Sequence, residues 1–233
     1  MTLNPASASA GTCWRQSRPE NFRTLLRSIA KHWKIFLYMA LLMTFMNLAS
    51  HGTQDMYPTY LQQQKGFGPH RTSDFTAFSM VGAILGGLTF GHLSDLYGRR
   101  RAMVTAILLG VLMIPLWMFA PNVPLILVGG FLMQFMVQGA WGVIPAHINE
   151  LSPDQLRGFF PGLAYQFGVL LAAGSPYIQA RLAVHMTYAQ AMGSFALVVF
   201  LVGSLVIGLG PEARGAKFGR GASANEIVPE RGG

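Results

Sequence analysis

Long apolar blocks recur along the sequence and restrict the fold more than any other feature. The block MVTAILLGVLMIPLWMFA, residues 103–120, is close to the ~20 residues with which an α-helix crosses a bilayer. Charged residues make up 11% of the chain, well below the proportion of about a quarter in soluble domains. Only helices and closed barrels satisfy their backbone polar groups in lipid, and these blocks lack the alternation of barrel strands. We therefore expect an all-α membrane protein.

Six such blocks can be distinguished, and each predicts one membrane-spanning helix. The predicted spans are roughly Lys34–Tyr60, Phe75–Leu93, Met103–Ala120, Val123–Ile148, Phe159–Ala180 and Thr187–Leu209. We assign residues 1–32 to a polar N-terminal segment, residues 33–210 to the six-helix membrane bundle, and residues 211–233 to a disordered cytoplasmic tail. Residues 21–32 suit either an interfacial helix on an anionic leaflet or a solvated linker helix, and both interpretations stay open.

The lysine and arginine residues are divided unequally between the two sides of the predicted spans. Fourteen fall in segments on one side and three on the other. Because cytoplasmic segments carry the excess of basic residues, we expect a multi-pass protein of the plasma (inner) membrane with both termini cytoplasmic. The formal net charge of +8 would suit a nucleic-acid partner in a soluble protein. Because the basic residues lie between apolar blocks, we expect the lipid bilayer as partner and no nucleic acid.

The first predicted span carries an unusual run of polar residues, NLASHGTQDMYPT at residues 47–59. At about 100° per residue, Ser50, His51, Gln54 and Asp55 share one side of a helix with Asn47. Ionisable residues cost free energy in the hydrocarbon core, and they are therefore functional candidates. The alternative is that His51 and Asp55, four residues apart, only satisfy each other in the interior. We favour a polar face toward a water-filled cavity, because the run has more polar residues than such a pair needs.

Two further motifs lie at the ends of predicted spans. GHLSDLYGRRR, residues 91–101, places an aspartate between two glycines, and ELSPDQLRG, residues 150–158, follows the fourth span. Both resemble loop signatures that the major facilitator superfamily carries in each half of its fold. The resemblance implies a cytoplasmic charge network that holds one conformation closed, whereas the alternative is a set of independent surface charges. The members of this cytoplasmic gate would be Asp95, Arg99, Arg100, Glu150 and Arg157.

The polar run is also similar to a narrower signature, N-x-x-S-H-x-[ST]-Q-D-x-x-x-T, of the Jen-type lactate/pyruvate permeases in the sialate:proton symporter group. This resemblance implies proton-coupled symport of a small monocarboxylate, with sialic acid or another organic acid as the alternative substrate. His51 and Asp55 would carry the proton, since histidine changes charge near neutral pH and the two groups would titrate as a coupled pair. The substrate-binding residues would be Asn47, Ser50, Gln54 and Thr59.

The fourth and second predicted spans add weaker candidates. Gln134 and Gln138 lie one helical turn apart and could bind substrate in the same cavity, although hydrogen bonding between helices explains them equally well. Gly82 and Gly86, spaced by four residues, predict close helix packing. The sequence has no cluster with metal-ligand spacing and no catalytic motif. We therefore expect no enzyme, no metal and no cofactor apart from the coupled proton.

The resemblance extends from about His32 to Phe218 and matches only the C-terminal six-span half of a major facilitator transporter. It therefore implies a partner, which would be an N-terminal six-helix half from the same gene or a separate chain, or a second copy of this chain. We favour a fragment of a full transporter, because Met1 falls where a linker between halves would be. The alternative from another class is a truncated half that transports nothing and acts as a membrane interaction protein.

Overall fold

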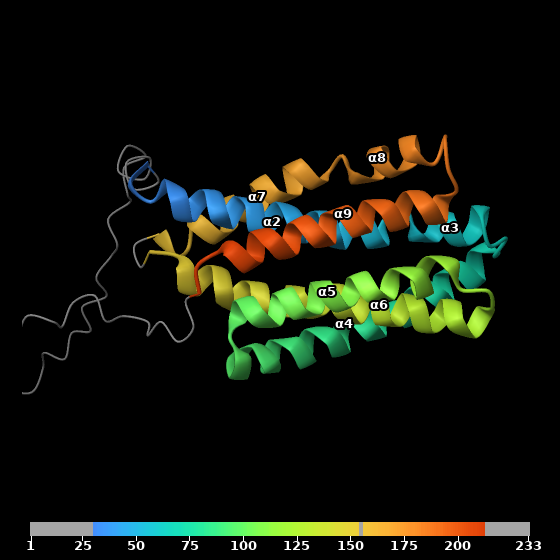
Figure 1. Ribbon diagram of the computed structural model, residues 1–233, viewed down its shortest axis with the longest axis horizontal. Coiled ribbons are helices and arrows are strands. Elements are labelled where there is room, and N and C mark those ends of the chain that lie inside the picture. Colours follow the sequence, from blue (N-terminus) through green and yellow to red (C-terminus); the bar gives the residue numbers. More distant parts are fainter. Residues whose placement is uncertain (1–29, 154–155, 213–233) are drawn as a thin grey trace, which may run out of the picture. The chain divides into compact units, whose positions relative to one another are not determined.

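A computed structural model describes residues 30–153 and 156–212 of the chain (Figure 1). The chain divides into two compact units, residues 1–33 and 34–233, and the helix packing described below lies within the second. The predicted helix at residues 21–32 falls largely outside the described residues. The predicted disordered tail, residues 211–233, lies outside the described residues from residue 213 onward.

The described part of the chain is built from α-helices, as the apolar blocks predict. The helices are α2 (Trp33–Gln54), α3 (Tyr57–Gln63), α4 (Pro69–Tyr97), α5 (Arg99–Phe119), α6 (Val123–Leu151), α7 (Phe160–Ala172), α8 (Ser175–Leu182) and α9 (Tyr188–Leu209). Five segments are long and apolar enough to cross a membrane: α2 together with α3, and α4, α5, α6 and α9. Helix α6 packs against both α4 and α5, and α5 packs against α9. The all-α membrane fold is therefore confirmed.

The structure corrects the fifth predicted span, which we expected to be one helix from Phe159 to Ala180. Two shorter helices, α7 and α8, occupy this region, and the chain turns between them at Ala173 and Gly174 (Figure 1). Pro176 lies in the first turn of α8 and has no backbone N–H to bond to the preceding turn. Proline also disfavours the helical conformation in the residue before it. The combination of glycine and proline therefore ends one helix and begins another.

The first predicted span also contains a break, and it falls inside the polar run. Helix α2 ends at Gln54 and α3 begins at Tyr57, with Pro58 in its first turn. The backbone N–H of Asp55 still donates to the carbonyl of His51 over 3.0 Å, so these two residues remain one helical turn apart. Helix α3 is anchored on α5, where the Tyr60 hydroxyl donates to the Met118 carbonyl over 2.7 Å.

Helices α4 and α6 approach closely at glycine positions. A Cβ atom added to Gly82 would collide with the carbonyl of Phe131, and one added to Gly86 would collide with the carbonyl of Phe135. On the opposite helix, a Cβ added at Gly142 would lie 2.8 Å from the Cα atom of Gly87. Small residues permit such backbone approach between membrane helices, where van der Waals packing drives association. The predicted role of Gly82 and Gly86 in helix packing is confirmed.

Candidate functional site

The first part of the candidate site is the pair of ionisable residues at the end of α2. The Nδ1 atom of His51 lies 3.2 Å from a carboxylate oxygen of Asp55. The two side chains remain 45% and 35% exposed, respectively. The two groups predicted to carry a proton are therefore in contact, and both remain accessible from outside the bundle. A pair that served only to satisfy its own polar atoms in the interior would be more deeply buried.

A network of amides and hydroxyls lies beside this pair, between α2 and α6. The Ser50 hydroxyl accepts from the Gln54 amide over 3.1 Å and from the Gln138 amide over 3.0 Å. The Gln54 amide also donates to the Gln134 side-chain oxygen over 3.1 Å, and Gln134 donates to the Thr53 hydroxyl over 3.3 Å. The structure thus joins the predicted residues of the first span to those of the fourth. These hydrogen bonds also match the interpretation in which the glutamines link helices.

The structure adds one residue to this network and leaves two predicted residues outside it. Thr53 is fully buried and accepts from Gln134. It matches the serine-or-threonine position of the signature, but it was not among the predicted substrate-binding residues. Asn47 is 2% exposed, and its amide donates to the Met43 carbonyl of the same helix over 2.8 Å. Thr59 lies on α3, beyond the break. Substrate roles for Asn47 and Thr59 stay predictions.

The second part of the candidate site is a charged cluster at the α4–α5 junction, which we call the arginine end of the bundle. Its members are Asp95, Arg99, Arg100, Arg101, Glu150 and Glu212. Arg99 lies 2.6 Å from the carboxylate of Asp95 and 3.0 Å from that of Glu150. It also donates to the Ser94 hydroxyl over 2.7 Å. Arg99 is thus the centre of the cluster, because it holds both predicted acidic residues.

The other two predicted gate residues bond to backbone carbonyls. Arg100 donates to the Gly210 carbonyl after α9 over 2.6 Å. Arg157 donates to the Asn149 carbonyl near the end of α6 over 3.1 Å. Both arginines therefore bind helix C-termini, where the exposed carbonyls and the helix dipole favour cations.

Glu212 is a member of the arginine end that sequence reasoning did not single out. Its carboxylate accepts from the backbone N–H groups of Arg99 and Arg100 over 3.1 and 3.2 Å. These are the first residues of α5, where backbone donors have no partner inside the helix. Gly98 precedes them with φ of 99°, a conformation that favours glycine. Glu212 therefore caps α5 from a distant position, and its only sequence signal is an acidic residue just after the last apolar block.

Loss of the Arg99 side chain should destabilise the arginine end. In Arg99→Gln, the Glu150 carboxylate, whose side chain is 9% exposed, would keep its charge without its cation. We expect a loss of about 2 kcal/mol in the free energy of unfolding, with partial recovery in the Arg99→Gln, Glu150→Gln double variant. Unfolding in detergent measures both effects. Arg181→Gln removes an exposed arginine from α8 and serves as the control. An equal loss in that control would contradict the assigned role of Arg99.

The long apolar helices, with a hydrogen-bonded polar network between two of them, define a multi-pass membrane protein. The comparison with protein families agrees, because residues 21–212 match the family described as "Sugar (and other) transporter". The chain therefore belongs to this family, which is part of the major facilitator superfamily. Among the described residues, no group of three histidine, cysteine or acidic side chains could hold a metal ion.

Three curated proteins illustrate what the chain is similar to. A carboxylic acid transporter protein homolog of Saccharomyces cerevisiae is 34% identical over 69% of this chain and 26% of its own length. A protein of Cupriavidus pinatubonensis named "Probable 4-methylmuconolactone transporter" is 32% identical over 60% of this chain and 33% of its own. The niacin transporter of Acinetobacter baylyi is 26% identical over 71% of this chain and 38% of its own. The chain thus spans well under half the length of these relatives.

Proposed function

We propose that the chain supplies one half of a transporter that moves a small carboxylate together with a proton. The observation that carries this proposal is the partly exposed His51–Asp55 pair, at 3.2 Å, directly beside the Ser50–Gln54–Gln138 network. A name among the relatives supports the same substrate class, since the yeast protein is a carboxylic acid transporter homolog. Lactate and pyruvate are the proposed substrates, and sialic acid or another organic acid is the alternative.

The proton-coupling part of the proposal follows from charge balance. A monocarboxylate is an anion near neutral pH, and moving it inward against an inside-negative potential costs free energy. A proton carried in the same cycle removes that cost, because the pair is neutral. Histidine is the side chain that changes charge between about pH 5 and 8. We propose that protonated His51 attracts the carboxylate, and that Asp55 stabilises the protonated imidazole until the substrate arrives.

Substrate orientation is the role that we propose for the neighbouring amides. Gln54 and Gln138 both donate to the Ser50 hydroxyl, so two N–H donors converge on one small acceptor. A carboxylate oxygen could take the place of that acceptor, because amide N–H groups bond to charged oxygens at least as strongly as to a hydroxyl. Trp141, one turn further along α6, has its ring 6.3 Å from that of Tyr165 and would limit the size of the site.

The proposal also requires a second half, because His51 and Asp55 are open on one side. We propose an N-terminal six-helix half, from the same gene or another chain, or a second copy, to cover them and complete the site. The transporter would lie in the plasma (inner) membrane with both termini of this chain on the cytoplasmic side, as the distribution of basic residues predicts. The arginine end would then be the cytoplasmic gate. A half that transports nothing is the competing proposal.

Labelled lactate uptake tests the proposal directly. The chain is reconstituted into liposomes, alone and with a supplied N-terminal six-helix half, and an inward proton gradient is imposed. We expect uptake when both halves are present, and we expect a protonophore to abolish it. Uptake by the chain alone would favour a pair of identical copies. A folded two-half complex without uptake would favour the non-transporting alternative. Preferential uptake of labelled myo-inositol would show that the substrate is a polyol and not a carboxylic acid.

A further inference from the structure

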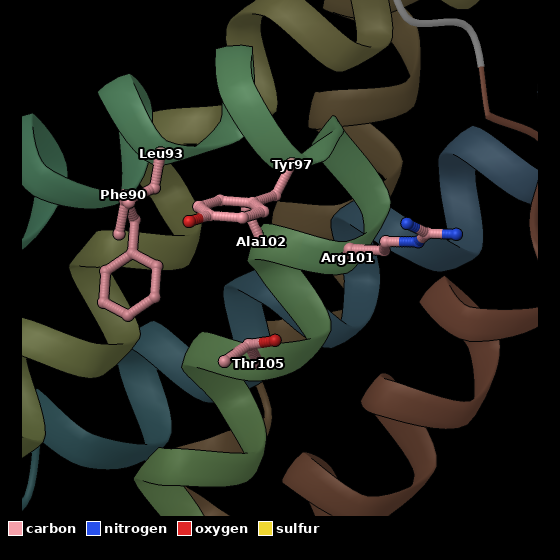
Figure 2. Close-up of a pocket in the computed structure, with 6 residues that line it drawn as sticks. All are labelled: Phe90, Leu93, Tyr97, Arg101, Ala102 and Thr105. Atoms are coloured by element: carbon pink, nitrogen blue, oxygen red, sulfur yellow. The ribbon is translucent and has the colours of Figure 1, made fainter.

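A cavity of about 340 Å³ opens at the arginine end, beside the turn that joins α4 to α5 (Figure 2). Its lining residues are Phe90, Leu93 and Tyr97 of α4, and Arg101, Ala102 and Thr105 of α5. In the view of Figure 2, the polar ends of Arg101 and Thr105 point in the same direction, away from the ring of Phe90. In Figure 2 the Tyr97 hydroxyl points the other way, toward Phe90 and Leu93, so the cavity combines apolar side chains with separate polar groups. None of its residues belongs to the proton or substrate candidates.

Arg101 differs from the two arginines that precede it. Arg99 is held by Glu150, and Arg100 by the Gly210 carbonyl. Arg101 is exposed and makes no hydrogen bond or ion pair with the part of the chain that the structure describes. It lies in the first turn of α5, which is long and apolar enough to cross a membrane, and lipid headgroups surround the ends of such helices. An arginine there offers a planar set of donors that suits a phosphate group.

Thr105 provides a second unpaired donor on the same face of α5. It lies four residues after Arg101, so the two side chains are neighbours on the helix surface. Thr89 on the neighbouring helix donates to the carbonyl of Leu85 over 2.7 Å, the usual arrangement for threonine within a helix. The Thr105 hydroxyl makes no such bond within the described residues. Two polar groups on the same face of α5 are therefore available to a ligand.

The same face of α5 becomes apolar deeper along the helix. Leu108 and Leu112 follow Arg101 and Thr105 at helical spacing, and they are 42% and 66% exposed. From Arg101 to Leu112 the helix rises by ~16 Å. The surface thus has a cationic end, a hydroxyl one turn away, and an apolar stretch beyond them, and its total length is similar to that of much of an acyl chain. Such a surface is complementary to an amphiphile, a molecule with a charged head and an apolar chain.

We propose that the cavity and this face of α5 form a binding site for an anionic phospholipid. Its phosphate bonds to Arg101 and Thr105, and one acyl chain lies against Leu108 and Leu112 with part of it in the cavity. A neutral phospholipid would leave the guanidinium without a net counter-charge. A free phosphate ion would make no use of the apolar side chains. The excess of basic residues at this end further favours an anionic leaflet.

Native mass spectrometry of the full chain, purified in a neutral detergent, tests the site. The probes are phosphatidylglycerol and phosphatidylcholine with identical acyl chains, and the readout is the fraction of chain that carries lipid. We expect Arg101→Gln to lower the affinity for phosphatidylglycerol about tenfold, and Arg101→Lys to retain most of it. Arg181→Gln is the matched control, because it removes the same charge from an exposed position on α8. It should leave the affinity unchanged.

A second variant tests the cavity itself. Thr105→Phe keeps Arg101 but places a ring over the cavity, and we expect it to weaken phosphatidylglycerol binding as well. Because Thr105 is exposed, this change is compatible with the fold. Equal binding of the two lipids, or equal losses in Arg101→Gln and Arg181→Gln, would overturn the proposal. Displacement of the lipid by inorganic phosphate would assign the site to a soluble anion instead.

Discussion

Proton-driven accumulation of lactate should disappear when His51 is replaced by glutamine. Glutamine can still form a hydrogen bond to Asp55, but it cannot take up and release a proton. A symporter that moves one proton with each anion accumulates substrate about tenfold for each unit of pH difference, because a tenfold ratio of proton concentration drives a tenfold ratio of substrate. In His51→Gln, paired with a supplied N-terminal half, we expect this ratio to fall to about one. Uptake into liposomes under a pH gradient measures it.

The neighbouring variants make this result specific. Asp55→Asn should show the same loss, because Asp55 contacts the imidazole of His51. His92→Gln is the control, since His92 is exposed on α4 and is not part of either network. Accumulation that still follows the proton gradient in a His51→Gln, Asp55→Asn double variant would show that the proton is carried elsewhere. An equal loss in the control would indicate a general effect of removing a histidine.

Replacement of Gly86 by leucine should prevent α4 and α6 from packing. Even one added carbon at this position would collide with the backbone of Phe135, which is part of a helix and cannot rotate away as a side chain can. We expect a loss of ~3 kcal/mol or more in the free energy of unfolding, since overpacking against backbone cannot be relieved by a change of rotamer. Thermal unfolding in detergent, followed by circular dichroism, measures this loss.

Gly208→Leu provides a matched control for the glycine variant. Gly208 is also a helical glycine, in α9, but no atom lies within 4 Å of the Cβ that it would gain. The same side chain is therefore added to a membrane helix without a collision. We expect this control to unfold at nearly the temperature of the unmodified chain. If both variants lost the same stability, close approach of α4 and α6 would not explain the effect.

The sequence predicts those features that depend on local pattern. The long apolar blocks predicted six spans, and five of them are helical segments long and apolar enough to cross a membrane, because burial in lipid requires continuous apolar length. The spacing of His51 and Asp55 predicted their contact, since residues four apart on a helix are neighbours. The four-residue spacing of Gly82 and Gly86 predicted close packing for a similar reason. In each case the pattern that carries the prediction lies within one helix.

Other features depend on how separate helices meet, and local pattern alone does not show them. The resemblance of the two loop motifs placed Asp95, Arg99 and Glu150 in one network, but it did not show which residue holds the others. Arg99 holds Asp95 and Glu150 together because α4, α5 and α6 converge at one end of the bundle. Asn47 shares the polar side of an ideal helix, yet in the structure its amide bonds to its own helix. The break between α7 and α8 could have been foreseen from Gly174 and Pro176. The apolar length of the block outweighed this signal in our interpretation.

The bond between Glu212 and the start of α5 has a practical consequence for anyone who labels this protein. The carboxylate of residue 212 accepts from the first two backbone amides of a helix that begins more than a hundred residues earlier. A fluorescent protein or affinity tag fused directly after Leu209 would remove this contact and leave those amides without their partner. A fusion placed beyond Glu212 preserves it. The choice of fusion point therefore decides whether a reporter observes the native bundle or one with a frayed α5.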